Sequence, residues 1–107
     1  MAEIAHEFCY FPFPGGRGEA IRICIHASGI ECKHSDLPFP AYQEKKKETQ
    51  DFAWKNGLPV LIVGGKTYSQ SLAMLRYFGK KAALYPTDDV LALAVDEVMD
   101  VAQVRID

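Results

Sequence analysis

The chain has 107 residues and a formal net charge of -2 at pH 7; 49% of its residues are apolar and 24% are charged. This length suits one domain of ordinary size with a single hydrophobic core. The small net charge gives no electrostatic support for binding nucleic acid or an anionic membrane. No apolar run approaches the length of a membrane-spanning helix, so we predict a soluble globular protein.

The cysteine pattern argues against a disulfide framework and against a zinc site. The three cysteines, Cys9, Cys24 and Cys32, are odd in number and form no C-x-x-C pair. The histidines show no metal-ligand spacing with one another or with a cysteine. The first residues lack the basic start and apolar stretch of a signal peptide. We therefore expect no metal site and a protein of the reducing cytoplasm.

The first half of the chain predicts a strand, a helix, a strand and a helix. Residues 7–11 are aromatic and run into a loop rich in proline and glycine, which is typical of a strand end. Residues 19–28 carry an apolar stripe at helical spacing, and Gly29 follows where a C-terminal cap belongs. Residues 30–37 fit a second strand, and the polar residues 41–50 fit a short exposed helix.

The second half predicts a β-hairpin and a helix. Residues 58–63 form a continuous apolar run typical of a buried strand, residues 64–65 are two glycines suited to a tight turn, and residues 66–69 return. Residues 71–78 fit a helix with Gly79 as its stop. This order predicts an α/β fold with a four-stranded mixed sheet and flanking helices, the layout of a thioredoxin-like domain.

The last segment differs in character from the rest. Residues 1–79 are predicted to form the thioredoxin-like domain, residues 80–87 a linker, and residues 88–107 the first helix of an all-α second domain. Thr87 is the predicted N-cap of that helix. The helix is apolar on most of its circumference and needs covering on more than one face. We therefore expect either a partner subunit or a piece of a longer protein.

Four segments, in order, carry a family resemblance that spans nearly the whole chain. They are Tyr10-Phe11 with residues 17–22, residues 51–61 with their Gly-Leu-Pro-Val-Leu ending, residues 70–77 beginning Gln-Ser-Leu, and residues 95–100 of the last helix. Together they resemble the N-terminal domain of cytosolic glutathione transferases, closest to the sigma-like classes with a catalytic tyrosine. The resemblance implies a glutathione-binding half with glutathione as co-substrate, a small electrophile as second substrate, and a homodimer.

The resemblance implies that Tyr10 and Arg17 activate the glutathione sulfur for conjugation, the chemistry of detoxification. A free thiol has a pKa near ~8.5, so only a few per cent is thiolate at neutral pH. A tyrosine hydroxyl at the end of the first strand can donate a hydrogen bond to the thiolate, and Arg17 is the natural nearby cation. Lowering the thiol pKa by one to two units requires roughly 1.4 to 2.8 kcal/mol, within reach of such a pair.

The other implied ligand contacts come from three segments. The backbone of Leu58 pairs with the cysteinyl part of glutathione, and Pro59 is expected to follow a cis peptide bond. Gln70 and Ser71 hold the γ-glutamyl end at a helix N-terminus, where free N–H groups favour an anion; alternatively, Ser71 only caps the helix.

Tyr42 and Lys46 have the spacing of the family's tryptophan and lysine that reach the glycine carboxylate, with tyrosine in place of tryptophan.

Two other functions compete with conjugation. Some relatives use a cysteine near the position of Cys9 for thiol–disulfide exchange, but strand alternation places Cys9 on the sheet face opposite Tyr10, where it would be buried and inert. The same fold also serves as a non-catalytic glutathione-binding or interaction module. The shortness of the chain favours this second alternative, because the electrophile pocket is built largely by the helical domain.

Overall fold

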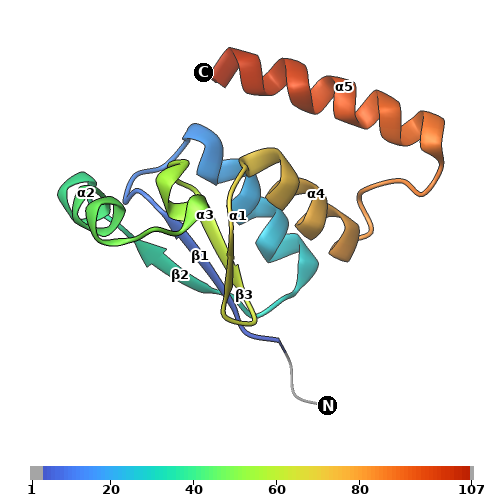
Figure 1. Cartoon of the computed structure of the whole chain (residues 1–107). Helices are drawn as coiled ribbons and strands as arrows, with labels where there is room; N and C mark the ends of the chain where they lie inside the picture. The colour runs from blue at the N-terminus through green and yellow to red at the C-terminus, as the bar shows by residue number, and fades with distance from the viewer. Residues whose placement is uncertain (1–3, 107) are drawn as a thin grey trace.

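The computed structural model describes residues 4–106 and has a four-stranded mixed sheet at its centre (Figure 1). The strand order is β2-β1-β3-β4. β1 pairs with β2 in parallel, whereas the β1–β3 and β3–β4 pairs are antiparallel. The strands are β1 (His6–Tyr10), β2 (Lys33–Asp36), β3 (Val60–Val63) and β4 (Lys66–Tyr68). The predicted sheet is thus confirmed.

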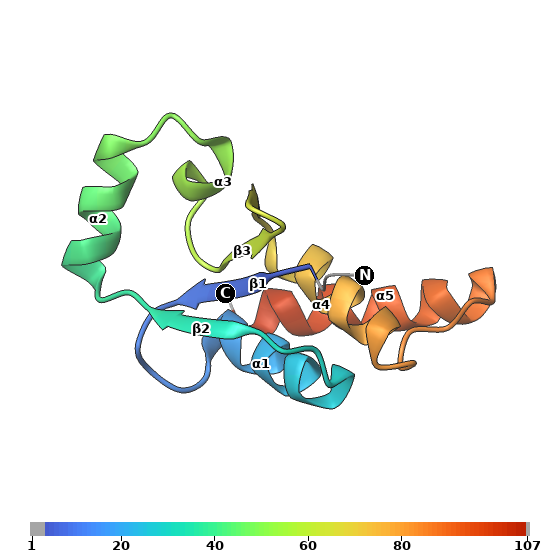
Figure 2. The same ribbon diagram turned by 90° about the horizontal axis from the view of Figure 1, so that it is seen from below.

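Helices cover both faces of the sheet. α1 and α4 pack on one face, α2 and α3 pack on the other, and α5 lies outside α1 and α4 (Figures 1 and 2). The helices are α1 (Gly16–Ser28), α2 (Phe39–Glu48), α3 (Phe52–Lys55), α4 (Ser71–Lys81) and α5 (Asp89–Ile106). Each face therefore has its own apolar core, as two packed layers require.

Alternation along β1 divides its side chains between the two cores. Phe8 and Tyr10 pack with α1 and α4, and Cys9 packs with Tyr42 of α2 and Trp54 of α3. All three β1 side chains are nearly inaccessible, at 1%, 6% and 2% exposed for Phe8, Tyr10 and Cys9. The predicted placement of Cys9 opposite Tyr10 is confirmed, because successive strand residues face opposite sides.

The hairpin between β3 and β4 is built as its two glycines predict. Gly64 and Gly65 both have positive φ, at 58° and 84°. A two-residue hairpin turn with positive φ at both positions has the twist that suits the flanking strands. Residues with side chains disfavour these angles, so glycine is preferred at both positions.

Two predicted elements in the first half have different ends. The second strand covers only Lys33–Asp36 rather than residues 30–37. The Ile30 N–H instead donates to the Ser28 hydroxyl at 3.1 Å, in the turn that leaves α1. α2 starts at Phe39 rather than at residue 41. Pro40 fits this first turn because its missing N–H would have no helical partner there.

α3 was not predicted from the sequence. The Asp51 carboxylate accepts the Ala53 N–H at 2.9 Å and so caps this single turn. Asp51 also accepts a hydrogen bond from the Thr67 hydroxyl of β4. An aspartate before Phe52 was the available signal for this N-cap.

Gly79 does not end the helix that begins at Ser71, so that prediction is wrong. α4 continues to Lys81, and Gly79 is buried within it against Tyr85. The helix ends instead with Ala83 in the left-handed region at φ 59°. The Leu84 N–H donates to the Gly79 carbonyl at 2.8 Å, and the Ala83 N–H donates to the Lys80 carbonyl at 3.2 Å. These two bonds form a Schellman motif, which satisfies the last carbonyls without a glycine.

The predicted cap of the last helix is also wrong by one residue. The carboxylate of Asp88, not the hydroxyl of Thr87, accepts the Leu91 N–H, at 2.9 Å. A carboxylate at this position both satisfies a free N–H and faces the positive end of the helix dipole.

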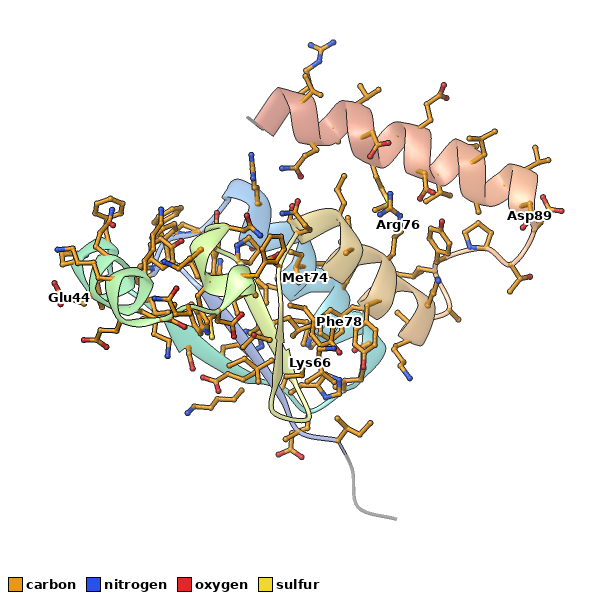
Figure 3. All side chains as sticks on the ribbon, in the orientation of Figure 1. Glu44, Lys66, Met74, Arg76, Phe78 and Asp89 are labelled. Atoms are coloured by element: carbon orange, nitrogen blue, oxygen red, sulfur yellow. The ribbon has the colours of Figure 1, made fainter. Side chains whose placement is uncertain are left out.

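α5 contacts α4 and the linker through a polar cluster, and many of its apolar side chains are exposed to solvent. Arg76 of α4 donates to Asp96 of α5 at 2.9 Å, and the Tyr85 hydroxyl donates to the same carboxylate at 3.0 Å. Figure 3 shows Arg76 between the two helices. Several α5 side chains are 55% to 73% exposed: Val90, Leu91, Leu93, Val98, Val101 and Val104. Over residues 4–106, no helix is long and apolar enough to cross a membrane.

Candidate functional site

Three strand ends and two helix starts meet at one edge of the sheet. β1, β2 and β4 run in the same direction, because β3 is antiparallel to both β1 and β4. α1 follows β1 and α4 follows β4, so both helices begin at the edge where these strands end (Figure 1). The outside of the carboxyl ends of strands is where α/β folds commonly bind ligands.

The strand register brings three of the predicted site residues to this edge. Cys9 pairs with Val60, so the next residue of β1, Tyr10, lies opposite Pro59. Leu61 pairs with Tyr68 at the end of β4, and Gln70 follows two residues later. Tyr10, Pro59 and Gln70 therefore lie at the same end of the sheet, although they are far apart in the sequence.

The Leu58–Pro59 peptide bond is cis, as predicted. Pro59 is buried and Leu58 is half-buried. Leu58 packs against both apolar cores, which holds the start of β3 between them.

The Tyr10 ring lies against the first turn of α1. A Cβ on Gly18 would fall 2.6 Å from Cε2 and 2.7 Å from Cγ of the ring. A Cβ on Gly16 would fall 2.5 Å from the hydroxyl oxygen. Both positions must therefore be glycine for the ring to lie there, and the Tyr10 hydroxyl sits beside the first residue of a 13-residue helix.

Gln70, at the N-cap position of α4, has a backbone conformation that is unusual for a residue with a side chain. Its φ and ψ are 82° and 110°, and its side chain does not cap the helix. Such a conformation costs a non-glycine residue of order 1 to 3 kcal/mol and is found mostly at ligand sites. Ser71, the first residue of α4, donates from Oγ to Oε1 of Gln103 at 3.4 Å. The N-cap position of α4 is Gln70, so the alternative that Ser71 only caps the helix is wrong.

Arg17 lies at the junction of α1, α4 and α5. A cavity of about 150 Å³ there is lined by Arg17, Ser71 and Gln103 together with apolar side chains. The structure thus brings two predicted site residues, Arg17 and Ser71, to one cavity. A larger cavity of about 660 Å³ lies between α5 and the linker and includes none of the predicted site residues.

Tyr42 and Lys46 come from α2, on the other face of the sheet. Tyr42 is 5% exposed, and its hydroxyl donates to the Trp54 carbonyl at 2.8 Å. Burial raises the pKa of this hydroxyl. Its ring meets that of Phe11, the residue after Tyr10, with centroids 5.9 Å apart. Lys46 is exposed one turn further along α2.

Arg22 contacts Tyr10 and was missed by sequence reasoning. Its guanidinium carbon lies 5.1 Å from the centre of the Tyr10 ring. The available signal was spacing, since Gly18 and Arg22 are four residues apart and share one face of α1.

Cys9 is placed for packing rather than for chemistry. Burial raises the pKa of the Cys9 thiol to about 12, and the Glu7 carboxylate adds to this effect. The thiolate is the reactive form of cysteine, so such a thiol is a poor nucleophile at neutral pH. No group of three or more His, Cys, Asp or Glu side chains among residues 4–106 could hold a metal ion.

We expect Cys9 to resist alkylation in the folded protein. A brief pulse of iodoacetamide at neutral pH, followed by peptide mass spectrometry, should modify Cys24 and Cys32, which are partly exposed, well before Cys9. The same pulse in denaturant is the control and should modify all three cysteines. Rapid modification of Cys9 in the native protein would contradict this assignment and revive a thiol-transfer reaction.

Comparison with known proteins identifies the relatives of this architecture. No known protein-family model matches the chain. It is 28% identical over 97 residues to the probable glutathione S-transferase 6 of Caenorhabditis elegans, a match that covers 91% of this chain and 45% of that protein. Among solved structures, prostaglandin synthase D of Nilaparvata lugens superposes with a TM-score of 0.78 at 30% identity and covers 91% of this chain and 46% of its own.

A hookworm protein gives a third match. The monomeric glutathione S-transferase Na-GST-3 of Necator americanus superposes with a TM-score of 0.79 at 27% identity, covering 92% of this chain and 46% of its own. This chain has the fold of the N-terminal half of a glutathione transferase. It spans less than half the length of each of these three proteins. In this fold α1 to α4 belong with the sheet, and α5 corresponds to one helix of a second domain.

Proposed function

We propose that this chain is the glutathione-binding half of a sigma-like, tyrosine-type glutathione transferase that activates the glutathione thiolate for attack on an electrophile. The observation that carries the proposal is the convergence of two helix N-termini, those of α1 and α4, at the sheet edge where Tyr10 and Leu58–Pro59 lie. Each N-terminus presents free N–H groups and the positive end of a dipole. Glutathione carries two carboxylates and an ionisable thiol. The positive ends of the two helix dipoles favour binding of these negative groups at this edge.

The sulfur end is assigned to Tyr10. Its hydroxyl lies beside Gly16 at the start of α1, where the N–H of the N-cap residue Gly15 donates to the Glu19 carboxylate at 3.3 Å. A thiolate held there would accept a hydrogen bond from Tyr10 and lie in the favourable field of the helix, the setting that lowers thiol pKa values in proteins. Arg17, one residue further along α1, adds a positive charge to the same end of the helix.

The remaining contacts follow from the other segments at the site. The backbone of Leu58 would pair with the cysteinyl residue beside Pro59, and Gln70 with Ser71 would hold the γ-glutamyl carboxylate at the start of α4. Lys46 would reach the glycine carboxylate, with Tyr42 beside it. Since the Tyr42 hydroxyl already donates to Trp54, Lys46 is the stronger candidate for this contact.

We also propose the wider organisation expected from the sequence. Residues 1–79 would form the glutathione-binding domain, residues 80–87 a linker whose first two residues still belong to α4, and residues 88–107 would open a helical second domain. The exposed apolar side chains of α5 support its burial in a homodimer or against the rest of such a domain. Location in the cytoplasm stays a prediction from the cysteine pattern. Neither alternative function is favoured, since Cys9 is buried and the relatives are transferases.

Replacement of Tyr10 by phenylalanine tests the proposal. With Tyr10→Phe we expect glutathione to bind but the bound thiolate fraction near pH 7 to fall roughly 10- to 100-fold, the effect of one lost hydrogen bond to a charged group. Titration calorimetry measures the affinity, and the ultraviolet absorbance of the thiolate against pH measures the ionisation.

Tyr68→Phe is the matched control, because Tyr68 is an exposed tyrosine on β4. It should leave both affinity and ionisation as in the unmodified chain. Ser71→Ala should weaken glutathione binding without changing the ionisation of the bound glutathione thiol. A folded chain that binds no glutathione, or a thiolate signal unaffected by Tyr10→Phe, would contradict the proposed function.

A further inference from the structure

Arg22 connects the proposed catalytic tyrosine to the loop that follows it. From α1, its Nη2 donates to the Phe11 carbonyl at 3.1 Å and its Nη1 donates to the Phe13 carbonyl at 3.2 Å. The Arg22 side chain is only 24% exposed, and Glu19 lies 3.5 Å from its Nη1. One guanidinium therefore binds two backbone carbonyls of the loop between β1 and α1.

The same guanidinium lies over the ring of Tyr10. The distance from its carbon to the ring centre is 5.1 Å, within the range of a cation–π contact. The ring edge of Phe13 also meets Tyr10, with centroids 5.7 Å apart. The Tyr10 ring is thus held by Arg22, by the loop that Arg22 binds, and by the close approach of Gly18.

We infer that Arg22 is the positioning residue for Tyr10: it fixes the direction of the hydroxyl and places a positive charge against the ring. This inference rests on the proposed function. A planar guanidinium suits this place because it can donate to two acceptors and stack on a ring at once, which a lysine ammonium cannot do. The charge favours the polarised hydroxyl that donates to a thiolate.

The two arginines of α1 then have separate places. Arg17 lines the cavity between α1, α4 and α5 together with Ser71. Arg22 lies one helical turn beyond Gly18, on the face that meets Tyr10. The support of the sulfur that the sequence assigned to Arg17 alone is therefore shared, with Arg22 acting through Tyr10 and without contact to the ligand.

Arg22→Met, compared with Ile23→Met, tests this role. Ile23 is the next residue of α1 and is 62% exposed, so its variant carries the same new side chain without touching Tyr10. In Arg22→Met we expect glutathione affinity within about threefold of the unmodified chain but a bound thiolate fraction about tenfold lower, a shift of about one pH unit in the thiol titration. Ile23→Met should match the unmodified chain in both measurements.

A second readout needs no ligand. In protein labelled with meta-fluorotyrosine, the fluorine resonance of Tyr10 is the one missing from Tyr10→Phe. We expect this resonance to move or broaden in Arg22→Met and to stay unchanged in Ile23→Met. Arg22→Lys keeps the charge but not both carbonyl contacts, so it should restore part of the thiolate signal, and it serves as the test if Arg22→Met does not fold.

The outcomes separate the inference from the proposed function. If the unmodified chain binds no glutathione, the proposed function fails, and the fluorine resonance alone decides the role of Arg22. If the chain binds and ionises glutathione but Arg22→Met and Arg22→Lys both titrate like Ile23→Met, the inference is overturned while the proposed function stands. An unchanged Tyr10 resonance in both Arg22 variants would also overturn it.

Discussion

Gly18→Ala is expected to lower the free energy of unfolding by about 1 to 3 kcal/mol, the usual cost of overpacking a close contact. The new methyl group would fall within 2.7 Å of ring carbons of Tyr10, whose ring is almost fully buried and cannot move aside without disturbing its neighbours. Glutathione ionisation should fall with it, because the hydroxyl is carried by the displaced ring. Urea unfolding and the thiolate titration measure the two effects.

Gly79→Ala is the matched control for this prediction. Gly79 also lies within a helix, but a Cβ there would meet nothing closer than Cβ of Tyr85 at 3.9 Å, an ordinary contact. The better helix propensity of alanine should then raise the free energy of unfolding by up to about 1 kcal/mol. If Gly18→Ala proved as stable as Gly79→Ala, the placement of the Tyr10 ring against α1 would be wrong.

Gln70→Gly should have opposite effects on stability and on binding. Glycine accepts the positive φ of 82° without the strain of a side chain, which costs about 1 to 3 kcal/mol. Glycine also has more freedom to lose on folding, which offsets roughly 0.5 to 1 kcal/mol of that gain. We therefore expect a net stabilisation of about 1 kcal/mol in urea unfolding. Calorimetry should show glutathione affinity falling about tenfold, the loss of one hydrogen bond to a charged group.

Ala83→Gly separates the two effects. Apart from glycines, Ala83 and Gln70 have the positive φ values of residues 4–106, and Ala83 ends α4 away from the candidate site. Its replacement should stabilise the chain, since glycine is favoured at this place in a Schellman motif, and leave glutathione affinity unchanged. Equal affinity of Gln70→Gly and the unmodified chain would mean that the conformation of Gln70 does not serve the ligand.

Local sequence patterns determined most of the secondary structure. The apolar run 58–63, the glycine pair of the hairpin and Gly29 at the end of α1 all act through their own backbone or nearest neighbours. Gly29 has φ 71°, and its N–H donates to the His26 carbonyl, as a C-terminal cap requires. Such signals can be interpreted without knowledge of the rest of the fold.

The exact ends of the helices depended on which of several possible capping contacts forms, and sequence patterns alone do not decide this. Thr87 and Asp88 are both good caps, and only the path of the chain into α5 decides that Asp88 accepts the Leu91 N–H. Gly79 has the composition of a helix stop, yet it packs against Tyr85 and stays helical. The single turn α3 depends on Asp51, whose other oxygen is held by Thr67 from β4.

For the candidate site as well, some features follow from the sequence and others only from the tertiary structure. By itself the sequence determined which residue types belong to it, because Tyr10, Leu58–Pro59 and Gln70-Ser71 occur in short motifs that resemble those of a known family. Only the tertiary structure decided that Tyr10, Pro59 and Gln70 lie at the same end of the sheet, since this follows from the pairing of three strands. It also decided the place of Arg22, because the carbonyls of Phe11 and Phe13 meet the guanidinium only once the loop has folded back over α1. Motifs depend on nearby residues, whereas contacts between distant segments depend on how the whole chain packs.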